Sequence, residues 1–261
     1  MVNDKREQTI SNKEVYEAED VVSSYTTESS LSEPEKTVLN IFKDRLKNMR
    51  MLDIGIGGGR TTCNFAHIAK EYVGIDYSGN MINACKKRFP TPPESISFRV
   101  CDVRSMRIFE DNYFDFVLFS YNGIDVISHM DRLKALQEIE RVCRIGGYFC
   151  FSSHNLQGID QLFTPQLSAN PIRTLKKIAK YFLLRPTIKK LKQSRYAMIR
   201  DGAHNHRLVH YYIKPKEQIE QLSSAGFRNV RVYSLDGKEI EDKSRLGTIT
   251  DTLWLYYLCE A

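Results

Sequence analysis

The first residues whose types and spacing could do chemistry form a glycine-rich turn, MLDIGIGGGRTT. It reads Asp53-x-Gly55-x-Gly57-x-Gly59 and runs into a helical pattern. Glycines at such a turn let the backbone approach a ligand closely, and the helix that begins there directs free N–H groups at it. A dinucleotide fingerprint needs G-x-G-x-x-G/A. Here Arg60 stands at the third position, where its side chain would obstruct close packing of helix on sheet, so the turn predicts a ligand site without the dinucleotide pattern.

Alternating strand and helix patterns must position this turn. Ser32-Glu-Pro-Glu35 predicts a helix start with a capping box, and Gly146-Gly147 predicts the end of a helix over residues 131–145. Strands that alternate with helices imply a mostly parallel sheet covered on both faces. Apolar runs predict strands at residues 51–54, 71–76, 96–102, 114–120 and 148–155, and two more in NVRVYSL and DTLWLYYLCE.

Five motifs in chain order resemble the class I S-adenosylmethionine-dependent methyltransferases: DIGIGGG, GIDYSGNMI, VCDVRSM, FDFVLFSYNGID and RVCRIGGYF. The resemblance covers about residues 40–155, and the last two strands fit the end of the fold. It implies an α/β, Rossmann-like fold with a seven-stranded, mostly parallel sheet and a helical lid inserted before strand six. It also implies S-adenosylmethionine as cofactor and S-adenosylhomocysteine as product. Within the superfamily, the chain looks like the bacterial small-molecule or glycan-type members.

The resemblance divides the chain into four parts. We expect an N-terminal cap segment at residues 1–30 and a cofactor-binding core at 31–155. A basic helical lid or substrate insertion should occupy residues 156–213, and the C-terminal part of the core sheet should follow at 214–261.

The same resemblance assigns cofactor contacts. Asp76 would accept hydrogen bonds from both ribose hydroxyls, and such charge-assisted bonds contribute about 1.5–3 kcal/mol each. Asp102 would meet the adenine amino group, and the N–H of Val103 the ring nitrogen. Asp53 would orient the glycine loop or the methionine amine. An isolated acid at any of these places would otherwise be a helix cap or a loop carboxylate. The other expected cofactor contacts are Gly55, Gly57, Gly59, Tyr77, Met81 on the adenine face, Ser120 beside the sulfonium and Tyr25 in a cap over the cofactor.

Catalysis by such an enzyme needs a nucleophile in line with the sulfonium methyl, at about 3–3.5 Å, and exclusion of water. The ends of strands four and five, where a doubly wound sheet puts its reacting residues, carry Tyr121, Asn122, His154 and Asn155. His154 is the expected general base because its ordinary pKa lies near the working pH; the alternative is a structural histidine. Asn122 would hold the substrate by its amide, or else is the turn residue of an Asn-Gly pair. Tyr121 is expected at the reacting atoms and Asn155 in the substrate pocket.

A histidine-rich segment, HNHRLVHYY, occupies residues 204–212. Two histidines one residue apart could ligate a metal from a strand. No carboxylate or cysteine completes the set nearby, so we predict no metal site. A substrate-binding role is expected for His206, His210 and Tyr211, because the segment leads back from the insertion towards the sheet. The tyrosines could equally be core or lid aromatics.

The chain has 261 residues and a formal charge of +6, which is unevenly distributed. Residues 161–200 hold ten of the 38 Lys and Arg and no Asp or Glu, which leaves 28 basic and 32 acidic residues, a net of −4, elsewhere. An amphipathic helix is predicted from Pro171, broken near Arg185-Pro186. Its lysines could be solvated on a lid, could bind an anionic substrate, or could attach the protein to an anionic membrane surface.

Composition excludes several classes of protein. With 42% hydrophobic and 27% charged residues, the chain is not globally disordered. No apolar run approaches the roughly 18 residues of a membrane span, and the polar first residues show no secretory signal, so we expect a cytoplasmic location. The six cysteines form no C-x-x-C pair, which favours reduced thiols over a zinc ribbon or redox motif.

The predicted function is methyl transfer from S-adenosylmethionine to an oxygen or nitrogen of a small-molecule acceptor, with an anionic or glycan-linked acceptor favoured. The alternatives are a non-catalytic S-adenosylmethionine-binding protein, a dehydrogenase and an RNA methyltransferase. Nucleic acid is not the expected partner, because strand four ends in Ser-Tyr-Asn-Gly rather than an NPPY-like motif and no Pro-Cys nucleophile is present. The oligomeric state is not predicted.

Overall fold

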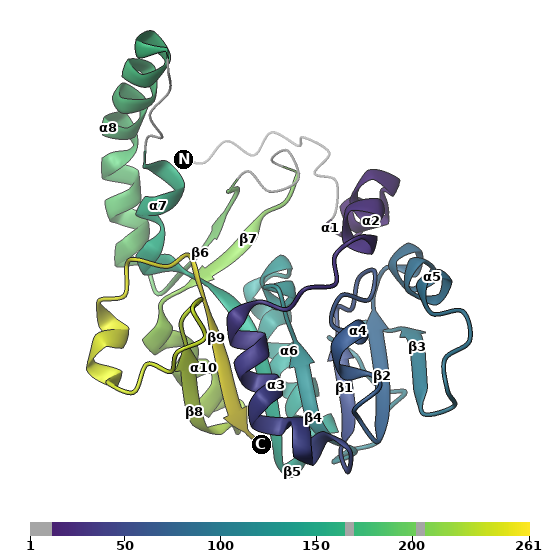
Figure 1. The fold of residues 1–261 in the computed structure, drawn as a ribbon. Coiled ribbons are helices and arrows are strands. Elements are labelled where there is room, and N and C mark those ends of the chain that lie inside the picture. The colour runs from purple at the N-terminus through teal and green to yellow at the C-terminus, as the bar shows by residue number, and fades with distance from the viewer. Residues whose placement is uncertain (1–11, 165–169, 202–206) are drawn as a thin grey trace.

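A computed structural model describes residues 12–164, 170–201 and 207–261 of the chain, and within them one sheet forms the centre of the molecule (Figure 1). Its main path runs β3-β2-β1-β4-β5, and β9 and β8 continue it on the far edge of β5. The strands are β1 (Arg50–Ile54), β2 (Glu71–Asp76), β3 (Ile96–Val100), β4 (Phe114–Phe119), β5 (Cys143–Asn155), β6 (Tyr196–Ile199), β7 (His210–Ile213), β8 (Arg228–Tyr233) and β9 (Trp254–Glu260).

Within the described residues the sheet has nine strands rather than the expected seven, and most of its ladders are parallel, as expected. The ladders from β3 to β5 are parallel, while β9 is antiparallel to both β5 and β8. The parallel strands therefore end at one edge, where a doubly wound sheet binds its ligands. The Rossmann-like α/β architecture predicted from the sequence is confirmed.

The insertion adds a hairpin that the sequence did not predict. In the register of β5, His154 pairs with Tyr212 of β7 on one side and with Trp254 of β9 on the other. Because β4 also pairs with β5 opposite β9, β7 lies beyond the end of β4, over the carboxyl edge of the sheet. β6 pairs with β7 in antiparallel register. The lid is thus a helix plus a two-stranded extension of the sheet rather than helical throughout.

Helices cover both faces of the sheet. Apolar side chains of α3 (Glu33–Leu46), α4 (Thr62–Phe65) and α5 (Gly79–Arg88) pack on one face, and those of α6 (His129–Val142) and α10 (Pro215–Ser224) pack on the other. Strands such as β4, buried along their whole length, read as continuous apolar runs for this reason. The remaining helices are α1 (Asn12–Glu17), α2 (Glu19–Thr26), α7 (Asp160–Phe163) and α8 (Pro171–Gln193), with 3-10 turns at Gly123–Val126, Leu156–Gly158 and Lys243–Gly247.

Two predicted boundaries are wrong. The helix expected over 131–145 ends at Val142, and β5 begins at once, because Cys143 pairs with Phe114 and the backbone of Gly146 and Gly147 bonds Ala261. Gly146 takes a left-handed turn within this strand rather than capping a helix.

The helix that begins at Pro171 does not break near Pro186. α8 continues to Gln193 with the proline inside it. Pro186 lies on an exposed side of the helix, where water can bond the carbonyl that the missing N–H leaves open.

Other sequence expectations agree with the structure. The capping box of Ser32 and Glu35 begins α3. All six cysteines are free thiols, four of them buried and two half-buried. Among the described residues, no helix combines the length and the apolar character needed to cross a membrane.

Candidate active site

A pocket opens where β1, β2, β3 and β4 end. The space within it is about 760 Å³ when the open solvent at its mouth is included. Most residues predicted to bind the cofactor lie in its wall: Tyr25, Gly55, Gly57, Asp76, Tyr77, Met81, Asp102, Val103 and Ser120. Asp53 and Gly59 are not in the wall.

Asp76 ends β2 as a buried carboxylate in the pocket wall. It accepts hydrogen bonds from the backbone N–H of Gly57, at 3.0 Å, and of Ser78, at 2.9 Å. Burial raises the pKa of the Asp76 carboxyl to about 6, and these two N–H groups only partly oppose that rise. The group therefore holds a costly charge at neutral pH and would gain from further hydrogen-bond donors in the pocket.

Asp102 follows β3 by two residues, because the strand ends at Val100 rather than at the expected residue 102, and it is half-exposed. Its carboxylate accepts bonds from the guanidinium of Arg104 at 2.6–3.1 Å, and from the Arg104 N–H at 2.9 Å. Although burial raises the pKa of Asp102, these bonds outweigh it and lower the pKa below its usual range. Arg104 also lines the pocket, so both the acid and its partner border the ligand space.

The glycine loop brings backbone to the pocket and also fits neighbouring segments. Gly55, Gly57 and Gly59 all have positive φ, which strains other residues. A Cβ on Gly59 would come within 2.6 Å of the Phe89 ring, so this glycine serves the packing of α5 rather than the pocket. Asp53 lies beneath the loop.

The Asp53 carboxylate accepts a bond from the hydroxyl of Tyr72 at 2.6 Å and interacts with the side chain of Thr61. Burial raises the pKa of Asp53 to about 6. Of the two roles expected for Asp53, these contacts match the one that orients the loop.

An N-terminal segment covers the pocket. Tyr16 and Tyr25, from α1 and α2, lie in the wall with ring centroids 6.1 Å apart, and Tyr16 is also 6.1 Å from Tyr77. The Glu17 carboxylate accepts bonds from the first N–H groups of α5, at Gly79 (2.9 Å) and Asn80 (3.2 Å). An acid at a helix amino end is favourable, so Glu17 fastens the cap to α5. Sequence analysis predicts Tyr25 in this cap but gives no role to Glu17.

A buried ion pair beside the pocket was also missed. Arg60 makes a bidentate pair with Glu35, at 2.6 and 2.7 Å, and donates to the Ser120 hydroxyl at 2.9 Å. Although burial raises the pKa of Glu35, Arg60 outweighs it and lowers the pKa. Ser120 also bonds Glu35, and the Tyr256 hydroxyl donates to the same carboxylate. The sequence analysis predicts a capping box for Glu35 and, for Arg60, only that its side chain would obstruct the packing of helix on sheet.

The chain turns sharply after β4. Tyr121 and Asn122 both take left-handed conformations, which cost energy for residues other than glycine and concentrate at functional sites. The Asn122 N–H is held by the Ser152 hydroxyl at 2.7 Å. Tyr121 borders the pocket, half-exposed, with the Arg60 guanidinium 4.1 Å above its ring. The turn thus sends Tyr121 to the pocket and Asn122 towards His154.

His154, the expected general base, is not in the pocket wall, and its ring belongs to a chain of polar contacts. Its Nδ1 is 2.7 Å from the Asp125 carboxylate, which pairs with the fully buried Arg132. Its Nε2 is 3.3 Å from the Asn122 amide nitrogen. Although burial raises the pKa of Asp125, Arg132 and His154 outweigh it and lower the pKa.

An ionised Asp125 can only accept a hydrogen bond, so the ring proton stays on Nδ1, Nε2 is the acceptor, and Asn122 presents its NH₂ to Nε2. The Asn122 carbonyl oxygen is then buried without a hydrogen-bond partner among the described residues. Asp125 lies in the motif FDFVLFSYNGID and Arg132 in the following helix, but the sequence analysis predicts no role for either.

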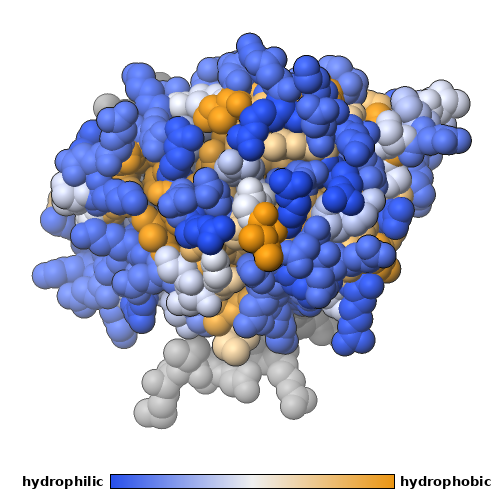
Figure 2. Space-filling model, turned by 90° about the horizontal axis from the view of Figure 1, so that it is seen from below, coloured by the Kyte–Doolittle hydropathy of each residue, from blue (hydrophilic) through white to orange (hydrophobic). Residues whose placement is uncertain are grey.

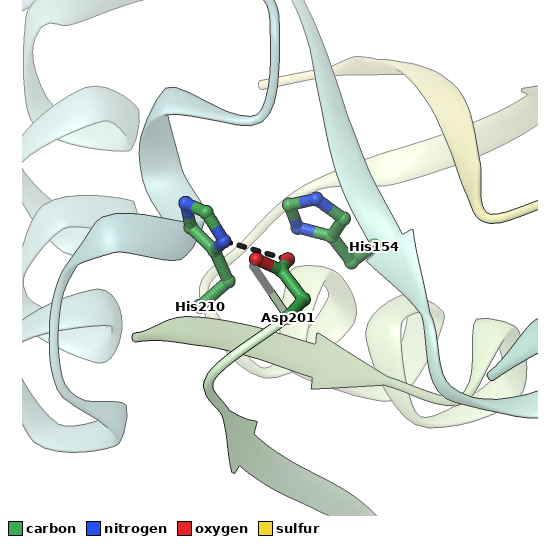
Figure 3. Close-up of side chains that lie close together, drawn as sticks. All are labelled: His154, Asp201 and His210. Atoms are coloured by element: carbon green, nitrogen blue, oxygen red, sulfur yellow. Dashed lines mark hydrogen bonds and ion pairs between the residues drawn. The ribbon is translucent and has the colours of Figure 1, made fainter. Parts of the chain in front are cut away.

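A second acid–histidine pair faces His154 (Figure 3). His210 Nδ1 is 2.7 Å from the Asp201 carboxylate, and the Tyr212 hydroxyl donates to that carboxylate at 2.8 Å. One ligand atom each from His154, Asp201 and His210 lie within 4.8 Å of one another. The contacts already described give all three side chains partners within the protein, and the absence of a metal stays a prediction. His204 and His206 lie outside the described residues.

Two residues expected in a substrate pocket have structural contacts instead. The Asn155 side chain is fully buried and donates to the carbonyls of Ile249 and Thr252, at 2.9 and 3.1 Å, while its oxygen accepts from the Gln157 N–H. These bonds anchor the loop before β9, and they use the side-chain amide of Asn155, which is therefore not available to a substrate.

Tyr211 is also buried, against the Arg132 guanidinium, 4.7 Å from its ring centroid. Its hydroxyl contacts His129 Nδ1 at 2.8 Å and accepts from Gln221 at 3.0 Å. Neither residue lines the pocket. The sequence placed Asn155 and Tyr211 near the right strand ends, but not the direction of their side chains.

Comparison with known proteins finds a family that part of the chain matches. Residues 52–151 match the family described as "Methyltransferase domain". A Schizosaccharomyces pombe protein named as an uncharacterised methyltransferase is 32% identical over 146 residues, 52% of this chain and 51% of that protein. The phthiotriol/phenolphthiotriol dimycocerosates methyltransferase of Mycobacterium tuberculosis is 28% identical over 150 residues, 55% of this chain and 53% of that protein. The chain thus spans about half the length of the curated relatives it matches.

Solved structures share the fold at low identity. An S-adenosylmethionine-dependent methyltransferase of Mesorhizobium loti aligns with a TM-score of 0.60 and 15% identity, over 87% of this chain and 98% of that one. A second, from Clostridium acetobutylicum, aligns with a TM-score of 0.58 and 14% identity, over 87% and 90%. At this identity the likeness concerns the fold alone.

Proposed function

We propose that the protein transfers a methyl group from S-adenosylmethionine to an oxygen or nitrogen of a small-molecule acceptor, because residues 52–151 match a family of methyltransferase domains. One observation carries the proposal: the buried Asp76 carboxylate and the glycine loop face a single pocket at the carboxyl edge of the sheet. A nucleoside with a vicinal diol supplies the donors that this carboxylate lacks.

The residues in the pocket fit the proposed cofactor. Asp76 would hold the ribose, and Asp102 with the Val103 N–H would hold the adenine edge. The buried Met81 side chain supplies an apolar wall, and the Tyr77 hydroxyl is buried without a hydrogen-bond partner among the described residues. Gly57 lines the pocket with a positive φ, a conformation that glycine adopts without strain.

The bound cofactor would supply a methyl group already activated on a sulfonium sulfur. The protein's part is then to position the acceptor and exclude water. Tyr16 and Tyr25 would do the second, since their rings cover the pocket from a segment fastened by Glu17. Tyr121, at the strained end of β4, would border the reacting atoms from below.

Asn122 and His154 would handle the acceptor. The unpartnered Asn122 oxygen needs a hydrogen-bond donor, and a hydroxyl or amine acceptor carries one, whereas a carbon nucleophile does not. His154 would take the acceptor proton through Nε2, while Asp125 holds Nδ1 and stabilises the imidazolium. Neither residue is in the pocket wall, and Nε2 of His154 contacts the Asn122 amide nitrogen, so this role needs the acceptor to replace that contact.

For the chemical class of the acceptor, we propose an anionic or glycan-linked small molecule. Its support is the basic insertion beside the site, together with the predicted contacts at His206 and His210. The name of the mycobacterial relative favours a small-molecule acceptor over nucleic acid.

Calorimetry with S-adenosylhomocysteine, with NAD(H) as the control ligand, tests the cofactor proposal. Binding of the first and not the second is expected, and no binding would overturn it. Production of S-adenosylhomocysteine from S-adenosylmethionine in a small-molecule extract then tests catalysis. His154→Ala should cut that rate by about 10²-fold or more while cofactor binding persists. Binding without turnover in any extract would favour the non-catalytic alternative, and an unchanged rate would remove His154 from the base role.

A further inference from the structure

α8 carries two apolar faces, and only one of them packs on the protein. Its packed face is formed by Tyr181, Leu184, Ile188 and Leu191, which join a cluster with Tyr212 of β7. Tyr212 stacks on the His154 ring, with centroids 4.6 Å apart. This face therefore fixes the C-terminal half of α8 to the insertion, close to the candidate site.

The other apolar face is exposed. Ile172, Leu175, Phe182 and Leu183 are 65%, 67%, 58% and 79% exposed. At 100° per residue these four positions share an arc of roughly 100°, and the centre of that arc lies nearly opposite the packed face. The N-terminal half of α8 also stands clear of the sheet, so nothing in the described parts of the chain covers this stripe (Figure 1).

Unpaired cations surround the stripe. Lys176, Lys189 and Lys190 are exposed and have no ion pair with any described residue, and the Arg185 guanidinium lies 5.7 Å from the Phe182 ring centroid. The segment 161–200 contains no acidic residue that could neutralise them. An aliphatic and aromatic stripe flanked by lysines is the surface that a helix presents when it lies in the interface of an anionic bilayer.

We propose that α8 docks the protein on the surface of an anionic lipid bilayer, with the stripe in the headgroup boundary and the lysines on lipid phosphates. A second copy of the chain fits poorly, because the same charge would face itself. A nucleic acid would leave the stripe in water. The face seen from below in Figure 2, away from α8, is mainly hydrophilic with apolar residues in scattered places. The proposal does not depend on methyl transfer.

Sedimentation with lipid vesicles, at about 0.1 M salt, tests the docking. We expect binding to vesicles with about 30% phosphatidylglycerol, much weaker binding to pure phosphatidylcholine, and release by salt. Lys189→Gln with Lys190→Gln should weaken binding roughly 25-fold, about fivefold per charge. The matched control changes Lys86 and Lys87, exposed on α5, to Gln and should bind as the unchanged protein does.

The apolar part is tested separately. Leu175→Ser and Leu183→Ser should each weaken vesicle binding about tenfold, and neither touches the packed face. Ile145→Ser, which removes another exposed apolar side chain far from α8, is the control and should have no effect. Equal binding to both vesicle types, or no binding, would overturn the proposal. Loss with the lysine variants but not the leucine variants would also overturn it and point to a polyanion or an acidic protein.

Discussion

Protonation of Asp76 should control cofactor binding below pH 7. Burial raises the pKa of this carboxyl to about 6 in the ligand-free protein. The ionised form accepts hydrogen bonds from ribose hydroxyls better than the neutral form, so a ligand that makes these bonds binds the ionised form. Affinity should therefore rise with pH through about 6 and then level off. With that pKa, the gain between pH 5 and pH 7 is about tenfold.

Asp76→Asn separates this effect from general changes in the protein. The substitution removes the charge from two bonds of about 1.5–3 kcal/mol each, so affinity for S-adenosylhomocysteine should fall roughly 10²-fold at pH 7. The pH dependence should vanish in the same variant. Isothermal titration calorimetry at several pH values between 5 and 7.5 measures both quantities.

Asp53 provides the matched control, because burial raises its pKa to about 6 as well. Its carboxylate faces Tyr72 and Thr61 rather than the pocket. Asp53→Asn should therefore keep the tenfold dependence on pH, and so should Asp102→Asn, whose parent carboxyl has a lowered pKa. An affinity that is flat from pH 5 to 7.5 in the unchanged protein, or a dependence that survives in Asp76→Asn, would refute the reasoning.

Three further changes test the surroundings of the site. Asp125→Asn should move the His154 ring proton off Nδ1, seen in ring ¹⁵N shifts, and should cost about 3–5 kcal/mol in urea unfolding because it leaves a buried arginine unpaired. Unchanged shifts would contradict this. Gly58→Ala would put a Cβ 2.4 Å from the Tyr25 carbonyl oxygen. Proteolysis of the N-terminal cap should therefore become faster, and the affinity for S-adenosylhomocysteine should fall about tenfold. Gly79→Ala, where a Cβ would meet open space, should change neither quantity. Glu35→Gln should also cost about 3–5 kcal/mol in the same unfolding assay; a loss below 1 kcal/mol would count against a structural pair.

The core of the fold was predictable from sequence because each of its strands has a strong local signal. β1, β2 and β4 are short, mostly apolar runs, and β2 has the predicted bounds. Turn residues and caps mark the ends of α3 and α10 in the same way. These signals depend only on neighbouring residues in the sequence, so they can be recognised in a single sequence.

The β6–β7 hairpin lacked such a signal. Tyr196–Ile199 is short and half-exposed, and its partner His210–Ile213 is reached only after an intervening segment. Pairing of β7 with the tip of β5 depends on where β4 ends, which is a property of the assembled sheet. No hydrophobic periodicity in the insertion predicts the pairing of β7 with β5.

The candidate site divides along the same line. The places of Asp76 at a strand end and Asp102 just after one can be predicted from the order of the strands, and the structure puts both in one pocket. Side-chain direction does not follow from topology. Asn155 turns to the loop before β9 while His154, one residue earlier, turns to Asp125, because successive side chains of a strand face opposite ways. Sequence alone could not tell which of the two faces the site.

Arg60 gives the clearest case of a sequence feature whose meaning changed. At the third fingerprint position, an arginine argues against a dinucleotide site, because a side chain there should push the helix from the sheet. In this protein the guanidinium turns away from that contact and ties Ser120 to Glu35 at the start of α3. The glycine loop, the end of β4 and the segment after the cap are thereby joined by one buried charge pair. An uncharged residue at position 60 would leave Glu35 buried without its cation, so the departure from the fingerprint is itself part of how this pocket is held together.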